Sequence, residues 1–113
     1  MSTIFTKIIN KEIPADIVYE DDELLAFNDI APQAPVHILI IPKKEISTLN
    51  NLKTEDGIIV GKMILLAQDL AKKFKIDQTG YRTVFNCNED GGQTVFHIHL
   101  HLLGGRQLGW PPG

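Results

Sequence analysis

The amino-acid sequence predicts an α+β fold, in which a largely antiparallel sheet carries one long helix on one face. Three observations predict this class. Five short β-favouring runs outnumber the helical stripes, short turns join most of these runs, and one long segment repeats apolar residues at helical spacing. The length suits a single domain, so residues 1–113 are expected to fold as one unit.

The first half is expected to hold a short helix and three strands. The segment TIFTKIINKE keeps its apolar side chains on one helical stripe, and Pro14 ends it. The runs DIVYED and ELLAFND (16–21 and 23–29) favour strands around a charged turn, which suits a hairpin. The two prolines of APQAP exclude a central strand there, and VHILIIP (36–42) supplies the next strand.

The second half is expected to hold one long helix and two strands. Thr54 is placed to cap the helix, and the apolar stripe then steps by three or four residues from Ile59 to Phe74. The turn residues DQTG follow it. The remaining strands are YRTVFN (81–86) and FHIHLHLL (96–103), with the loop CNEDGGQTV between them.

The composition narrows the classes of partner. A net charge of −3 argues against a broad surface for nucleic acid or for an acidic membrane. Cys87 is the single cysteine, which excludes an internal disulfide and a zinc cage built of cysteines. The N-terminal segment mixes charges among its apolar residues, and no apolar run approaches the roughly 18 residues of a membrane span. A cytoplasmic setting is therefore expected.

Three of the four histidines alternate along the last predicted strand. Because side chains alternate between the faces of a strand, His97, His99 and His101 are expected on one face, about 6.7 Å apart. His37 lies in another apolar strand, which is a candidate neighbour. A single histidine in a strand is usually structural, but this grouping favours a functional site.

A metal site is one interpretation of the cluster, because His-x-His on a strand can supply two zinc ligands. Catalytic zinc sites usually add carboxylates that orient the imidazoles. The nearest carboxylates in sequence, Glu89 and Asp90, fall in the loop instead of on the strand. Metal binding therefore remains open as the less favoured alternative.

The loop before the histidines favours an anion site. Two glycines, Gly91 and Gly92, let the backbone approach a ligand closely, and exposed amides in such a turn can surround an anion. Gln93 adds an amide donor and Thr94 a hydroxyl. A plain hairpin turn is the alternative, since Asp-Gly is a common turn sequence. The histidine strand directly after the loop favours the phosphate interpretation.

A histidine beside a bound phosphoryl group suggests a reaction. A neutral imidazole can act as nucleophile, and water can then cleave the phospho-histidine. Neighbouring amides and imidazoles would stabilise charge on the phosphoryl oxygens, and another imidazole can protonate the leaving group. This route needs no cofactor or magnesium ion, and the sequence contains neither a Walker loop nor a Gly-x-Gly-x-x-Gly motif.

The segment HIHLHLL (97–103) resembles the signature of the histidine-triad (HIT) family, in which histidines alternate with apolar residues. The resemblance is to the Hint branch and extends through IFTKIINKEIPA, AFNDIAPQAPVHILIIPKK, DGGQTVFHIHLHLLGGRQ and WPPG. It implies a five-stranded HIT-like sheet with one long and one short N-terminal helix, joined in a homodimer to a ten-stranded sheet. It also implies hydrolysis of purine nucleoside 5′-phosphoramidates to AMP, without a metal or cofactor.

The resemblance further implies roles for single residues. His99 is similar to the nucleophile that takes up AMP, and His101 to a phosphate contact. His97 is similar to a group that positions the pair, and His37 to a supporting fourth histidine. The other implied substrate contacts are Gly92, Gln93 and Thr94 in the phosphate loop, Asn86, Asp29 at the ribose with Ile30 packing nearby, and Trp110, whose tail would reach the partner subunit.

Several residues have a plainer interpretation without the resemblance. Phe5, Ile8, Phe27 and Leu39 would be core residues, whereas the resemblance suggests that some of them wall a base pocket. Thr94 stands where animal relatives generally have serine, which bears on rate and leaving-group preference. The residues interpreted as surface charges are Lys43, Lys44, Glu45 and Arg106.

Two hypotheses for function follow. The first is a hydrolase that works through a nucleotidyl-His99 intermediate. The second is a nucleotide-binding or partner-binding dimer in which slow turnover is incidental. The first is favoured because binding alone would not need a nucleophile flanked by two more histidines.

Overall fold

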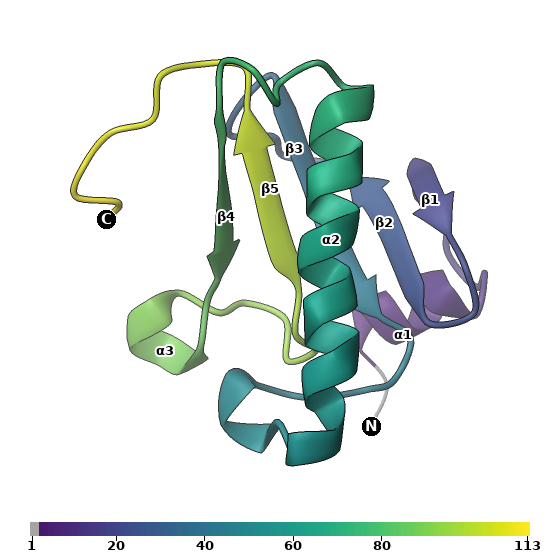
Figure 1. Cartoon of the computed structure of the whole chain (residues 1–113). Helices are drawn as coiled ribbons and strands as arrows, with labels where there is room; N and C mark the ends of the chain where they lie inside the picture. Colours follow the sequence, from purple (N-terminus) through teal and green to yellow (C-terminus); the bar gives the residue numbers. More distant parts are fainter. Residues whose placement is uncertain (1–2) are drawn as a thin grey trace.

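The computed structural model describes residues 3–113 and contains one five-stranded antiparallel sheet (Figure 1). The strand order is β1-β2-β3-β5-β4. The strands are β1 (Ile17–Glu20), β2 (Leu24–Asn28), β3 (Val36–Pro42), β4 (Tyr81–Phe85) and β5 (Leu100–Gly104). The helices are α1 (Ile4–Ile9), α2 (Gly57–Lys73) and α3 (Asn88–Gly91), with short 3-10 turns at Leu49–Asn51 and Thr54–Asp56. The predicted α+β class is confirmed.

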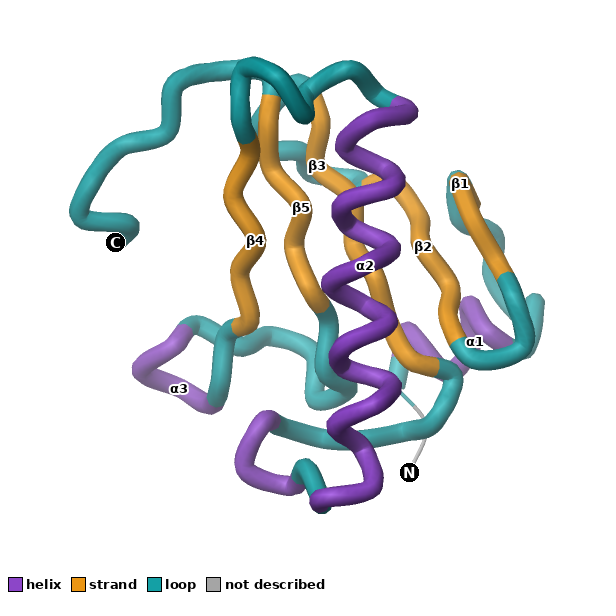
Figure 2. Tube along the Cα trace, in the orientation of Figure 1, coloured by secondary structure: helices purple, strands orange, loops and turns teal. Residues whose placement is uncertain are grey.

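The two faces of the sheet carry separate apolar clusters. Along β2, Leu24 and Ala26 join the larger cluster under α2, whereas Leu25 and Phe27 join a smaller one with α1. This alternation is what the period of two along a strand requires. Figure 2 shows the result, with α2 lying across one face of the sheet and α1 behind it. The face covered by α1 is the one that receives the histidines.

Helix α1 is short and depends on local and tertiary contacts. The Thr3 side chain caps the helix by accepting from the Thr6 amide at 3.3 Å.

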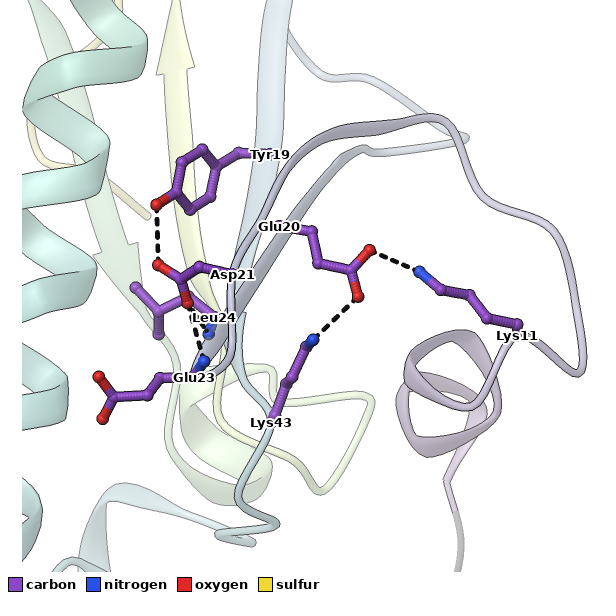
Figure 3. Close-up of polar contacts among 7 residues, drawn as sticks. All are labelled: Lys11, Tyr19, Glu20, Asp21, Glu23, Leu24 and Lys43. Carbon is purple, nitrogen blue, oxygen red and sulfur yellow. Dashed lines mark hydrogen bonds and ion pairs between the residues drawn. The ribbon is translucent and has the colours of Figure 1, made fainter.

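Beyond the helix, Lys11 and Lys43 both pair with the Glu20 carboxylate, at 2.7 and 2.9 Å (Figure 3). These bonds lower the pKa of the Glu20 carboxyl. Lys43 is therefore paired, which corrects its interpretation as a solvated surface charge. The same correction applies to Lys44, which pairs with the buried Asp56 carboxylate.

The predicted β1–β2 hairpin is present, and Asp21 organises its turn. The Asp21 carboxylate accepts from the amides of Glu23 and Leu24, both at 2.8 Å, and its other oxygen accepts from the Tyr19 hydroxyl (Figure 3). An aspartate that bonds amides two and three residues onward is a common turn former. The turn is therefore held by the side chain of one of its own charged residues, Asp21.

The start of the long helix differs from the prediction. Thr54 begins a 3-10 turn, and α2 starts at Gly57 with Asp56 at its N-cap position. The reason is that the buried Asp56 carboxylate accepts from the Lys53 amide and from Lys44, which leaves no capping role for Thr54. No helix in residues 3–113 is long and apolar enough to cross a membrane.

The last strand is also shorter than predicted. It begins at Leu100, because the ladder with β4 ends where Phe85 meets Leu100. The residues before it bond elsewhere, as the Ile98 amide does to Ile46 O at 2.8 Å. The preceding loop contains the one-turn helix α3, where a plain loop was expected.

Candidate active site

The four histidines gather on the sheet face that α1 covers. His101 lies on β5 and His37 on β3, while His99 and His97 lie in the segment leading into β5. The ring centres of His99 and His101 are 5.0 Å apart, and those of His37 and His101 are 5.2 Å apart. Phe5 of α1 stands edge-on to His99 at 4.9 Å. The predicted alternation therefore brings His99 and His101 together, and the pairing of β3 with β5 adds His37.

Backbone carbonyls determine the tautomers of His97 and His99. His99 Nδ1 lies 2.7 Å from His97 O, and His97 Nε2 lies 2.7 Å from Pro42 O. A carbonyl oxygen accepts only, so each of these nitrogens carries the hydrogen. Neutral His99 consequently has its lone pair on Nε2, and neutral His97 has its lone pair on Nδ1. His99 Nε2 is thus the nitrogen with nucleophilic character.

A chain of hydrogen-bond donors determines the tautomers of His37 and His101. The Gln33 amide donates to His37 Nδ1 at 3.0 Å, so neutral His37 carries its hydrogen on Nε2. That nitrogen lies 2.9 Å from His101 Nδ1, which must then accept, so His101 carries its hydrogen on Nε2. Among residues 3–113, this buried Nε2 has no hydrogen-bond partner. A donor without a partner beside a nucleophilic nitrogen is suited to a substrate oxygen.

All four imidazoles favour the neutral state. Burial lowers the pKa of His37, His97 and His99 below the usual value of 6.5. Burial, reinforced by the nearby His99 and His37, lowers the pKa of His101 to about 4. The Asp29 carboxylate opposes the lowering of the pKa of His37, His99 and His101 without reversing it. At neutral pH, His99 therefore keeps the lone pair that a nucleophile needs.

Asp29 and Ile30 lie in the turn after β2, next to His37. Asp29 Oδ1 accepts from the Ala31 amide at 2.8 Å, while Oδ2 faces His37 Nε2 at 3.5 Å. The Ile30 side chain is 97% exposed, so it is free to pack against a ligand. A cavity of about 340 Å³ opens here, lined by Asp29, His37 and the two prolines of the turn, among others.

Asp29, His37 and His101 also place three ligating atoms within 4.8 Å of one another. Two nitrogens on a tetrahedral zinc ion would lie about 3.4 Å apart. His37 Nε2 and His101 Nδ1 lie 2.9 Å apart, which is the distance of a hydrogen bond that shares one proton. The observed geometry therefore fits the donor chain better than a metal-ligand set.

The residues predicted to form a phosphate loop follow α3 directly and precede β5 in sequence. Gly92 ends α3 with a left-handed φ of 79°, and Thr94 is exposed. Gln93 is buried, and its side-chain amide donates to Ser47 O and Val95 O while accepting from the Asn88 amide. The side chain of Gln93 therefore braces the loop, which differs from its expected use as a donor to the anion. Asn86, half-buried, joins β4 to this loop.

The remaining predicted contacts lie in the buried cluster at α1 and on the C-terminal tail. Phe5, Ile8, Phe27 and Leu39 belong to the buried cluster between α1 and the sheet, and the ring of Phe5 stands edge-on to those of His97 and His99. Trp110 is 82% exposed on the tail, which runs past the edge strand β4 (Figure 1). Arg82 of β4 holds this tail by donating to Gly109 O at 2.7 Å.

Comparison with known proteins identifies the family of this chain. The family model described as HIT domain matches residues 10–108. The chain belongs to the HIT-domain family. It is 55% identical to the purine nucleoside phosphoramidase of Escherichia coli K12, over 95% of this chain and 90% of the relative. An uncharacterised HIT-like protein of Synechococcus elongatus is 57% identical over 98% of this chain and 96% of its own length.

Solved HIT structures share the fold. The crystal structure of a HIT family hydrolase from Legionella pneumophila aligns with a TM-score of 0.97 at 53% identity, covering 99% of this chain and all of that one. A histidine triad protein from Clostridium difficile aligns with a TM-score of 0.93 at 47% identity, covering 96% and 95%. The expected HIT fold is confirmed, and the chain is a HIT-family hydrolase.

Sequence reasoning missed the backbone partners of the histidines. Gln33 N–H, Pro42 O and His97 O set which nitrogen carries the hydrogen in His37, His97 and His99, respectively. Every residue has the same backbone groups, so no side-chain pattern identifies them. They become visible only when the fold places them against the rings.

Proposed function

We propose that this protein cleaves the P–N bond of purine nucleoside 5′-phosphoramidates and releases AMP through a nucleotidyl-His99 intermediate. One observation carries the proposal: the bond from His99 Nδ1 to His97 O leaves the lone pair on Nε2, in a site whose four imidazoles favour the neutral form. The 55% identity to an enzyme named purine nucleoside phosphoramidase supports the substrate class.

The reaction proceeds in two displacements. His99 Nε2 attacks phosphorus, the P–N bond breaks, and the leaving nitrogen takes a proton from solvent to depart as an amine. The phosphorus now carries the imidazole in place of the amine. Water then attacks phosphorus, the P–N bond to His99 breaks, and the water protons pass to solvent, which releases AMP and restores neutral His99.

The other residues bind and orient the substrate. The His101 Nε2–H donates to a phosphoryl oxygen, with charge stabilisation that grows in the transition state. His97 orients His99 through its carbonyl, and His37 orients His101. The Thr94 hydroxyl and the amides around Gly92 contact the phosphate, with Asn86 near the leaving group. Asp29 accepts from the ribose hydroxyls, and Ile30 packs beside the nucleoside.

We further propose a homodimer in which two copies join through β4. This strand is an edge of the sheet, so its outer backbone groups are available for pairing with a second copy. The tail that carries Trp110 runs past the same edge. In such a dimer the exposed indole reaches the partner's site and influences the choice of leaving group.

The test is AMP release from adenosine 5′-phosphoramidate by untagged protein in excess chelator. Rapid release supports the histidine nucleophile, whereas release that requires added zinc supports a metal site. AMP binding without release supports a nucleotide-binding dimer. Mass spectrometry of acid-free quenched samples, with His99→Ala as control, shows whether the adduct forms on His99.

A further inference from the structure

The segment after β5 contacts the turn that joins β2 to β3. Gly105 has a left-handed φ of 92°, and a Cβ added there would lie 2.8 Å from the Pro35 side chain. The chain therefore approaches the turn so closely that glycine is required. Arg106 follows, and its Nε donates to Gln33 O at 3.0 Å. This arginine thus attaches the C-terminal segment to the turn.

The same turn supplies the amide that faces His37. The Gln33 amide donates to His37 Nδ1 at 3.0 Å, and the Gln33 side chain donates to Ala31 O at 2.9 Å. Gln33 itself is exposed, whereas His37 is buried. An exposed turn thus sets the hydrogen-bonding pattern of a buried imidazole, and the Arg106 contact restrains that turn.

We propose that Arg106 is a positioning residue, which by holding Gln33 keeps the Gln33 amide on His37 and so keeps the free N–H of His101 directed into the active site. The consequence of this positioning for catalysis rests on the proposed function. The sequence indicated only a solvated surface charge at this position.

The physical basis is the direction of the donor chain. While the Gln33 amide donates to His37 Nδ1, the hydrogen of His37 must lie on Nε2 and point at His101. If the amide moves away, His37 can carry its hydrogen on Nδ1 instead. His101 would then place its own hydrogen on Nδ1, and its Nε2 would present a lone pair. A lone pair there would repel the phosphoryl oxygens that the N–H would have stabilised.

The first measurement is histidine tautomer state in the ligand-free protein, by ¹⁵N NMR of histidine-labelled protein at pH 7.5. The unchanged protein is expected to show His37 and His101 protonated at Nε2. Arg106→Ala is expected to show a mixture of tautomers at both rings. The matched control is Arg82→Ala, which removes the other arginine and its bond to the same C-terminal segment, and it should keep the unchanged pattern.

The second measurement is turnover of adenosine 5′-phosphoramidate. Arg106→Ala is expected to lower kcat by about tenfold while KM changes by less than about twofold, because a weakened donor acts in the transition state. If Arg106→Ala does not fold, Arg106→Met replaces it, since that side chain keeps the length without a donor.

The outcomes separate the two proposals. Unchanged histidine signals in the Arg106 variant overturn the positioning role, whatever the activity of that variant. Altered signals together with an unchanged kcat overturn it as well. The NMR measurement needs no turnover. Inactivity of the unchanged protein would therefore count against the proposed function alone.

Discussion

At the residue scale, the site depends on which nitrogen of each imidazole carries the hydrogen. Burial favours the neutral rings, and backbone partners then select one tautomer. His99 presents a lone pair, and His101 presents an N–H, from adjacent positions on one face. Two chemically identical side chains therefore present opposite hydrogen-bonding groups at Nε2, because their Nδ1 atoms face different partners.

Removal of the His99 imidazole is expected to abolish turnover and preserve binding. His99→Ala should lower kcat by several orders of magnitude, about 10⁴-fold or more, because the nucleophile is lost. The affinity for AMP should change little, since the proposed phosphate loop and the proposed ribose contact remain. Turnover assays and calorimetry with AMP measure the two quantities. Full activity in this variant would exclude the covalent route.

The hydroxyl of Thr94 is expected to matter more than its methyl group. Thr94→Val keeps the shape but removes the donor, and should lower kcat/KM for an AMP-amine substrate by about tenfold or more. Thr94→Ser keeps the hydroxyl, gains χ1 freedom and should stay within about fivefold of the unchanged protein. Equal kcat/KM for the valine and serine variants would show that the hydroxyl does not contact the substrate.

At the scale of elements, the loop around α3 is shaped by one buried amide. Gln93 connects this loop to Ser47 on a distant segment and to Asn88 at the start of α3. The loop can therefore hold a fixed shape although α3 is only four residues long. Its geometry depends on that side chain more than on helical propensity.

Loss of the Gln93 amide is expected to destabilise the protein. Gln93→Leu leaves the Asn88 amide and two carbonyls without their partner and should lower the free energy of unfolding by about 2 kcal/mol. Urea denaturation measures this loss. Gln68→Leu is the control, since Gln68 is exposed on α2 and should change stability by less than about 0.5 kcal/mol. Equal effects of both substitutions would refute the bracing role.

At the scale of the whole molecule, the buried histidines link stability to pH. The folded chain lowers the pKa of all four, to about 4 for His101, whereas the unfolded chain takes up protons near pH 6.5. Between these values the unfolded state binds more protons. The free energy of unfolding is therefore greatest above pH 6.5 and falls as the pH drops towards 4.

This dependence is measurable by urea denaturation at pH 7.5, 6.0 and 5.0. We expect a progressive loss of stability over this range, before the carboxylates with lowered pKa begin to contribute. His101→Gln removes one of the four titrating groups and should lose less stability over the same interval. A flat profile for the unchanged protein would contradict burial of neutral imidazoles.

Much of the fold could be predicted because its signals are local. The apolar stripe from Ile59 to Phe74 and the β-favouring runs gave the long helix and all five strands. The boundaries at Thr54 and Leu100 differ because tertiary contacts decide them. Asp56 occupies the N-cap position of α2 in place of Thr54, and β5 begins at Leu100 because its pairing with β4 ends there.

The sequence by itself determined that His97, His99 and His101 share one face, because alternation along the chain is a property of the backbone, whereas the pairing of β3 with β5 added His37. It also carried the HIT resemblance that comparison confirmed. Tertiary structure alone decided which nitrogen of each ring carries a hydrogen, and that Arg106 reaches the turn beside His37. The physical reason is that these contacts use main-chain donors and acceptors, which every residue shares, so only their placement in space makes them selective.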